Sequence, residues 1–230
     1  MQVHDTNFYG LSAQTLGNDK ESLLIEEGIA VNSTASLDYS DAEAVKVLGN
    51  PTEGALLLWL KKAGVDYLNL RESAETLEEL PFSTERKYMA TVVKSSLFEG
   101  KTILYVKGAP EIVSGLCKNI ENNVSQTDIE SQLVEYQNQA MRTLGFACQI
   151  IDGKADVFKD GKVVADNLTF MGVVAISDPV RLDVPAAVAE CMNAGINVKI
   201  VTGDTPGTAK EIGRQIGLWT AKDGDKNIIT

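Results

Sequence analysis

The sequence predicts an α+β protein, in which an antiparallel sheet flanked by helices is followed by a shorter, partial α/β segment. Two observations predict the first part. Short β-branched and aromatic runs stand next to turn signals, and amphipathic helical stretches lie between these runs. A third observation concerns residues 178–230, where a helix, a continuous apolar run and a second helix follow one another. Continuous apolar runs are typical of buried strands in doubly wound sheets.

The helices expected in the first part have recognisable starts and stops. One opens at Pro51, which needs no amide partner in a first helical turn, and is stopped by Gly64. Another has Thr127 as its expected N-cap, with Glu130 completing a capping box. The expected helices cover residues 20–31, 51–63, 71–79, 111–117 and 127–141.

Strands are expected where apolar, β-branched residues run between turn signals. Asp160-Gly161, between two short apolar pairs, is a strong hairpin signal. Residues 33–41 and 119–126 are polar and are expected to be loops. The expected strands are residues 3–9, 88–96, 101–106, 146–151 and 170–176.

The second part is expected to begin at a short joint, Asp178-Pro179-Val180-Arg181, which Pro179 stiffens. A helix over 184–194 is expected to have Asp183 as its cap and Gly195 just past its end. A strand is expected over 196–201. A last helix over 206–216 follows, capped by Thr205 or Asp204 and ended at Gly217.

Composition excludes several classes of partner. The formal net charge is −11, from 32 acidic and 21 basic residues, which argues against nucleic acid or anionic lipid as the main partner. An anionic ligand would therefore need a local cluster of Lys and Arg. No apolar run reaches the roughly 18 residues of a membrane span, and no secretory leader is recognisable. The three cysteines lack metal-ligand spacing and are expected to be small buried hydrophobes in a reducing compartment.

The pentapeptide Lys107-Gly108-Ala109-Pro110-Glu111 stands between an expected strand and an expected helix. Gly108 allows close backbone approach, and Pro110 and Glu111 suit a first helical turn. The pattern therefore favours a cation that faces a nucleotide. An ordinary strand-turn-helix joint with a lysine that faces solvent is the alternative.

Thr202-Gly203-Asp204 follows the expected buried strand and precedes a helix. Ligands of open α/β sheets bind at the carboxyl ends of the strands, and helix N-termini favour phosphate. These three residues are therefore candidates for a place near phosphate. A simple turn with Asp204 as N-cap explains the pattern equally well.

Several segments, taken in order along the chain, resemble the cytoplasmic headpiece of the P-type cation-transporting ATPases, and the calcium-pump branch most closely. The first three are the pentapeptide at Lys107, the joint at residues 178–181, and Val201-Thr202-Gly203-Asp204. Three further segments fit in the same order, and together the six span nearly the whole chain: Gly49-Asn50-Pro51-Thr52-Glu53, residues 82–89 (FSTERKYM) and Met141-Arg142-Thr143-Leu144.

The resemblance implies a nucleotide-binding domain at residues 1–177 and part of a haloacid-dehalogenase-like phosphorylation domain at 178–230. It places Phe82 against adenine and Glu53 at the adenine amino group. Lys87 and Lys107 line the base and phosphate side, Gly108 admits the ring, and Arg142 holds ribose or a phosphate. Thr202, Gly203 and Asp204 are implied to lie near phosphate, and Asp178, Pro179 and Arg181 to form a hinge.

Each of these residues also has a simpler explanation. Phe82 could belong to the core, and Glu53 could complement a helix dipole in a first turn. Lys87 and Arg142 could be solvated surface charges, which is the usual place for such residues. Only their joint order favours the nucleotide site.

The sequence departs from the family pattern at important places. The segment Asp-Lys-Thr-Gly-Thr that carries the phosphorylated aspartate is absent, and so is the Gly-Asp-Gly-x-x-Asp motif for Mg²⁺. Thr84 stands where some pumps have an arginine, which puts one phosphate contact in doubt. We expect a fragment that binds ATP or ADP without turning it over, because phosphoryl transfer needs the missing nucleophile and Mg²⁺. Residues 178–230 are expected to pack loosely, to rearrange or to pair with another copy.

The whole pump implied by the resemblance uses ATP and Mg²⁺ to move a cation. The fragment is expected on the cytoplasmic side of the membrane, beside the transmembrane, actuator and remaining phosphorylation parts. Ca²⁺ is the expected ion, and Na⁺, K⁺, Mg²⁺ or H⁺ are alternatives. A haloacid-dehalogenase-type phosphatase is disfavoured, since the one Asp-x-Asp, Asp223-Gly224-Asp225, follows no strand. A non-catalytic nucleotide sensor is a third class, but no dedicated partner surface is recognisable. The glycine fingerprints of Rossmann and P-loop enzymes are absent.

Overall fold

The computed structural model describes residues 1–41, 45–151, 156–178, 180–203 and 206–229. Its centre is a seven-stranded sheet, in which the strand order is β1-β11-β8-β6-β5-β4 and β7 lies beside β11. Neighbours along that order are antiparallel, whereas β7 is parallel to β11. The strands are β1 (Gln2–Phe8), β4 (Glu75–Leu80), β5 (Tyr88–Lys94), β6 (Thr102–Gly108), β7 (Asn119–Ile120), β8 (Arg142–Ile151) and β11 (Thr169–Ser177).

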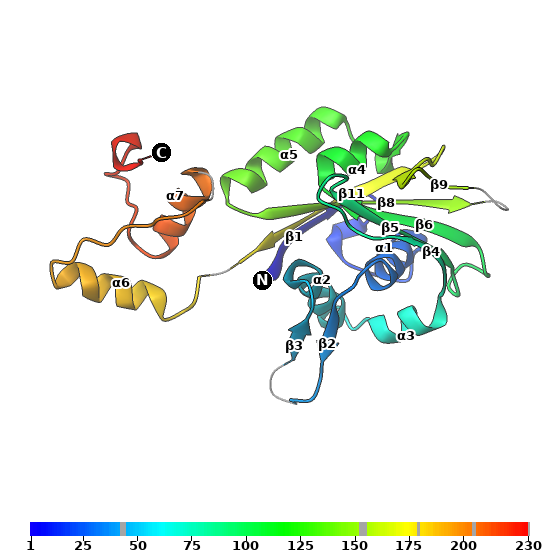
Figure 1. Ribbon diagram of the computed structural model, residues 1–230, viewed down its shortest axis with the longest axis horizontal. Helices are drawn as coiled ribbons and strands as arrows, with labels where there is room; N and C mark the ends of the chain where they lie inside the picture. The colour runs from blue at the N-terminus through cyan, green and yellow to red at the C-terminus, as the bar shows by residue number, and fades with distance from the viewer. Residues whose placement is uncertain (42–44, 152–155, 179, 204–205, 230) are drawn as a thin grey trace.

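Helices cover both faces of this sheet (Figure 1). Three lie on one face, α1 (Lys20–Val31), α2 (Pro51–Lys62) and α3 (Tyr67–Ser73), and two lie on the other, α4 (Pro110–Leu116) and α5 (Gln126–Asn138). Side chains alternate between the faces along each strand. In β6, Ile103 and Tyr105 pack toward α1, while Leu104 and Val106 pack in the core under α4 and α5. The expected α+β fold, an antiparallel sheet flanked by helices, is confirmed.

Short elements complete this part of the chain. They are η1 (Ser12–Gln14), β2 (Ser36–Asp38), β3 (Lys46–Leu48), η2 (Glu121–Asn123), β9 (Phe158–Lys159) and β10 (Lys162–Val163). The hairpin of β9 and β10 turns through Asp160 and Gly161, which both have positive φ, as Asp-Gly turns require. The start of α2 is also as expected, because the Asn50 side chain accepts hydrogen bonds from the amides of Thr52 and Glu53.

Four expectations about local structure were wrong. Residues 119–126, expected to be a loop, contain the strand β7 and the short helix η2. The acidic residues 71–79 do not form one helix, because α3 ends at Ser73 and β4 begins at Glu75. Pairing with β5 decides this segment, and as an edge strand β4 can carry exposed acids on its surface. Residues 33–41 contain the short strand β2, which pairs with β3. The N-cap of α5 is Ser125 in place of Thr127, since its hydroxyl accepts from the Asp128 amide at 3.1 Å.

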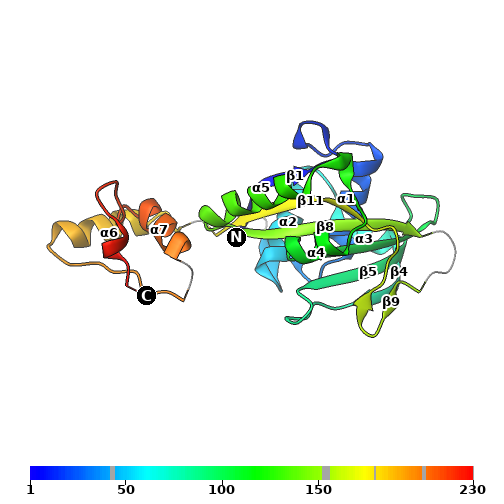
Figure 2. The same ribbon diagram turned by 90° about the horizontal axis from the view of Figure 1, so that it is seen from above.

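Residues after Ser177 extend beyond the end of the sheet, as both views show (Figures 1 and 2). They form α6 (Val184–Asn193), α7 (Pro206–Gln215) and η3 (Asp225–Asn227), and α7 lies near α5. The strand expected over 196–201 is not formed, so this prediction was wrong. A strand needs a hydrogen-bonded neighbour, and no described residue pairs with this segment, in which Val201 is 95% exposed. Asp183 stands at the N-cap of α6 without a capping side-chain hydrogen bond, and Asp204 and Thr205 lie outside the described residues.

Among the described residues, no helix has both the length and the apolar character needed to cross a membrane.

Candidate functional site

Lys107 lies one residue before the end of β6, on the face of Ile103 and Tyr105, where its partners belong to α1 and α2. Its ammonium group donates to the backbone carbonyl of Asn32, at the C-terminal end of α1. It also donates to Glu53 Oε1 at 2.7 Å, and only 5% of the Lys107 side chain and 7% of the Glu53 side chain are exposed. The lysine does not face solvent, and the ordinary-joint alternative is wrong in this respect.

Glu53 lies in the first turn of α2 and is held by the loop that follows α1. Its Oε2 accepts from the Thr34 amide at 2.9 Å, from the Thr34 hydroxyl at 2.7 Å and from the Ala35 amide at 3.1 Å. Since Oε1 accepts from Lys107, both carboxylate oxygens have partners within the protein. A charge buried this deeply needs such partners, because hydrogen bonds and an opposite charge replace the lost water.

The two charges of this pair respond differently to their surroundings. Burial opposes the ionisation of Glu53, but the Lys107 charge and the hydrogen bonds from Lys107 and Thr34 hold the pKa of Glu53 below its ordinary value. Burial also lowers the pKa of Lys107 below its ordinary value, although Glu53 acts in the opposite direction. The shift of Glu53 therefore favours the charged carboxylate, whereas the shift of Lys107 disfavours the charged ammonium group.

Arg71 of α3 adds a second cation to this cluster. Its guanidinium donates to the carbonyls of Ala30 at 2.9 Å and Ala35 at 3.1 Å, on either side of the loop that holds Glu53. Burial lowers the pKa of Arg71, and Tyr67 and Glu53 oppose this shift. The charge of Glu79 on β4 also acts on Lys107, so two carboxylates balance the two cations.

Three residues that complete the surroundings of Lys107 were not predicted from the sequence: Arg71, Asn32 and Thr34. Arg71 lies in a stretch whose secondary structure was misassigned, and Asn32 and Thr34 follow a helix as polar residues of no recognised pattern. Polar residues are common at helix ends. The place of Asn32 and Thr34 after a helix therefore gave no indication of the distant residues that they contact.

Gly108 is required for close packing of two strands. A Cβ on Gly108 would lie 2.3 Å from the carbonyl oxygen of Lys87 and 2.6 Å from Cα of Tyr88. Successive strand residues point to opposite faces, so this Cβ would lie on the face opposite the Lys107 side chain. The glycine therefore allows β5 to approach β6 closely.

Phe82 and Lys87 belong to the loop that joins β4 to β5. The Phe82 ring is 58% exposed, so the alternative that it belongs to the core is wrong. Lys87 is exposed and has φ of 60°, a conformation that is uncommon outside glycine, and its carbonyl accepts from the Ala109 amide at 2.9 Å. The loop thus holds Lys87 beside the end of β6 and carries an exposed aromatic ring.

Arg142 is the first residue of β8 and is exposed. Phe146 lies opposite Lys107 across β6 and β8. Arg142 is four residues from Phe146, so it shares the face of Lys107 and is displaced by about 13 Å along the strand. The start of β5, the end of β6 and the start of β8 therefore bring Lys87, Lys107 and Arg142 to one end of the sheet.

The residues expected near phosphate and at the hinge all follow the end of β11. Thr202 and Gly203 are exposed in the segment without a strand, and Asp204 and Pro179 lie outside the described residues. Asp178 is paired with the N-terminal amino group at 3.6 Å, and Arg181 with Asp183 at 2.8 Å. The described residues do not bring this group together with Lys107.

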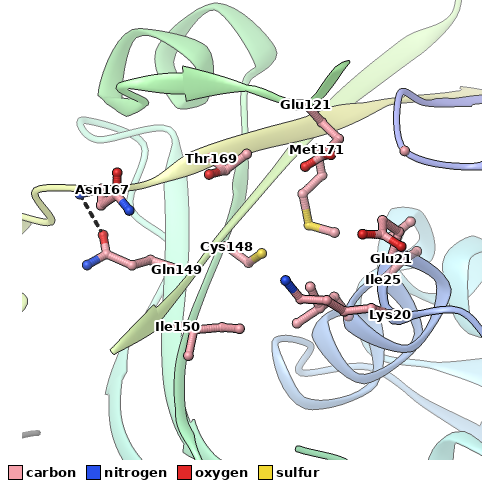
Figure 3. A pocket seen from close by; sticks show the side chains of 12 residues that line it. Lys20, Glu21, Ile25, Glu121, Cys148, Gln149, Ile150, Asn167, Thr169 and Met171 are labelled. Carbon is pink, nitrogen blue, oxygen red and sulfur yellow. Dashed lines mark hydrogen bonds between the residues drawn. The ribbon is translucent and has the colours of Figure 1, made fainter. Parts of the chain in front are cut away.

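A separate hollow of about 210 Å³ lies between the first turns of α1 and the strands β8 and β11 (Figure 3). Lys20 and Glu21 come from α1, and Cys148 and Met171 come from the sheet. Burial raises the pKa of Cys148 to about 12, so its thiol stays protonated at neutral pH. None of the residues that the sequence predicted for a nucleotide lines this hollow.

Metal ligands do not gather in the part of the chain that the structure describes. There, no group of three or more His, Cys, Asp and Glu residues could hold a metal ion.

Comparison with known proteins gives a consistent picture. A family model described as "P-type ATPase, cytoplasmic domain N" matches residues 22–183. The chain is 36% identical over 217 residues to calcium-transporting ATPase PAT1 of Dictyostelium discoideum. This match covers 90% of this chain and 19% of the relative. It is 33% identical over 230 residues to calcium-transporting ATPase 2, plasma membrane-type, of Arabidopsis thaliana, with coverage of 96% and 22%.

A relative with another name is similar to a comparable degree. The sodium/potassium-transporting ATPase subunit alpha of Drosophila melanogaster is 33% identical over 188 residues, which is 75% of this chain and 18% of that protein. The chain thus spans about a fifth of the length of these relatives. Since the family model covers most of the sheet and its helices, the chain belongs to the P-type ATPases and contains their cytoplasmic domain N.

Proposed function

We propose that this chain binds ATP or ADP at the end of the sheet where β5 begins, β6 ends and β8 begins. The observation that carries the proposal is that three cations, Lys87, Lys107 and Arg142, come from that end of the sheet, and that the loop before β5 carries the exposed ring of Phe82. A protein with a net charge of −11 needs such a local group to attract a polyanion. Aromatic faces stack on bases of any kind, which suits an exposed phenylalanine.

In this proposal the buried and the exposed residues have different tasks. Phe82 stacks on adenine, while Lys87 and Arg142 contact ribose or phosphates from the surface. Lys107 is a fixed charge below them, with one ammonium proton left after its bonds to Asn32 and Glu53. Both oxygens of Glu53 have protein partners, so we assign Glu53 to holding Lys107, in place of the expected contact with the adenine amino group.

The activity of the whole protein is part of the proposal. The names of relatives such as PAT1 support hydrolysis of ATP coupled to transport of Ca²⁺. The similarity to a sodium/potassium-transporting subunit keeps Na⁺ or K⁺ as the alternative. The phosphate end of the nucleotide would be bound with Mg²⁺ and with parts of the pump outside this chain, together with Thr202, Gly203 and Asp204. The hinge of the pump would be formed by Asp178, Pro179 and Arg181.

Phe82→Ala is expected to weaken ATP binding by about fivefold to 150-fold, since stacking of a base on an aromatic side chain contributes roughly 1–3 kcal/mol. The ring is 58% exposed, so its loss should change the free energy of unfolding by no more than about 0.5 kcal/mol relative to the wild type. Isothermal titration calorimetry and urea unfolding measure the two quantities.

Val134→Ala is the matched control, because Val134 is 54% exposed on α5, at the opposite face of the sheet. It should bind ATP like the wild type, and Phe82→Trp should keep most of the affinity. Equal affinity of Phe82→Ala and the wild type would remove Phe82 from the site, and absence of binding by the wild type would overturn the proposed function.

A further inference from the structure

Asn32 lies at the C-cap of α1, where the last helical turn meets the sheet, and only 1% of it is exposed. Its backbone carbonyl accepts from the Lys107 ammonium group. Its side-chain Oδ1 accepts from the Thr91 hydroxyl of β5 at 3.0 Å, and its Nδ2 donates to the Tyr105 carbonyl of β6 at 3.4 Å. Asn32 is thus bonded to β6, the strand that carries the lysine, and to its neighbour β5.

The orientation of this amide is fixed by its partners. A backbone carbonyl only accepts, so the Nδ2 group must face Tyr105 and Oδ1 must face Thr91. The backbone N–H of Asn32 also keeps its helical hydrogen bond, which it donates to the Gly28 carbonyl at 3.1 Å. With these bonds made, the remaining polar atom of Asn32, its carbonyl oxygen, is held toward Lys107.

We infer that Asn32 is a positioning residue for Lys107, and that Thr91 sets its orientation. Bound to Thr91 and Tyr105, Asn32 fixes the end of α1 over β5 and β6 and holds the ammonium group between its own carbonyl and Glu53. This inference rests on the proposed nucleotide site, because the consequence of a displaced ammonium group is weaker binding of ATP.

Thr91→Val tests the inference with the smallest change of shape. It removes the hydroxyl that donates to Asn32 and keeps a side chain of nearly the same volume. NMR of ¹⁵N-labelled lysine side chains reports the Lys107 ammonium group directly, since its burial and hydrogen bonds protect it from exchange with water. The expected result is a shifted or lost Lys107 signal, together with ATP affinity reduced by about two- to tenfold, as expected for one hydrogen bond.

Two further variants separate positioning from general damage. Thr91→Ser keeps the hydroxyl and should restore both the signal and the affinity. Thr6→Val changes a buried threonine of β1, at the other edge of the sheet, and should alter neither.

A Thr91→Val protein with the Lys107 signal and affinity of the wild type would overturn the inference. The NMR measurement needs no nucleotide, so the inference and the proposed function can fail independently. If the Lys107 signal moves but the wild type binds no ATP, the positioning of the ammonium group stands, while its consequence for binding and the proposed function both fall.

Discussion

Replacing Lys107 by methionine is expected to lower the free energy of unfolding by about 3–5 kcal/mol, because it leaves a buried carboxylate without its counter-charge. The Glu53 side chain is 7% exposed, so water cannot replace the lost ammonium group. The hydrogen bonds from Thr34 and Ala35 to Oε2 remain, but Oε1 loses its partner. Urea unfolding monitored by circular dichroism measures the loss.

The pH dependence gives this prediction a definite sign. In the wild type the pKa of Glu53 is lowered, so the stability it contributes at neutral pH is lost as the pH falls through the folded-state value. In Lys107→Met, burial without the counter-charge raises the pKa of Glu53, so protonation relieves the destabilisation. The difference between wild type and variant should therefore shrink as the pH falls toward the ordinary range of glutamate, about 4.3.

Two variants control for the loss of a lysine and for the pairing itself. Lys94→Met removes an exposed lysine from β5 and should change stability by no more than about 0.5 kcal/mol. The double variant Lys107→Met with Glu53→Gln should lose less free energy of unfolding than the two single variants lose in sum, because no unpaired charge remains. A cost for Lys107→Met as small as that for Lys94→Met would contradict the buried ion pair.

Gly108→Ala is expected to destabilise the protein by about 3 kcal/mol or more, or to prevent folding, because the new methyl group meets a neighbouring backbone. Its Cβ would lie 2.3 Å from the Lys87 carbonyl oxygen and 2.5 Å from Tyr88 Cβ. Relief requires β5 to move away from β6, which also disturbs the bond from the Ala109 amide to Lys87. Thermal unfolding and hydrogen exchange of β5 amides measure the effect.

Gly115→Ala is the matched control for this prediction. Gly115 lies in α4, and a Cβ there would meet nothing within 4 Å. Alanine favours helix over glycine by up to about 1 kcal/mol, so this variant should be neutral or slightly more stable. If Gly108→Ala is tolerated as well as Gly115→Ala, the close approach of β5 and β6 is not required for stability.

The sequence predicted what local chemistry decides. The start of α2 at Asn50 and Pro51 and the Asp160-Gly161 hairpin depend on residues next to one another, and both were found in the structure. Lys107 was identified from its pentapeptide for the same reason. Its partner Glu53 was identified separately, as a residue implied to contact adenine, because no local pattern indicates a pair joined across 54 residues of sequence.

Tertiary pairing decided what the sequence could not. The acidic segment Glu75–Leu80 has the composition of an exposed helix, yet its place beside β5 makes it an edge strand. The apolar run at 196–201 has the composition of a buried strand, and among the described residues it has no partner. Asn32 is a third case, because its role depends on Thr91 and Tyr105, which the fold brings to it from other strands.

Titration of the ¹⁵N-labelled chain with ATP, followed by amide chemical shifts, tests the central claim most directly, because it locates the nucleotide without any substitution. We predict shifts at Phe82, Lys87, Arg142 and the residues around Lys107, and unchanged signals at the hollow that Lys20 and Thr169 line. Shifts confined to that hollow, or no shifts at any ATP concentration, would contradict a nucleotide site at this end of the sheet.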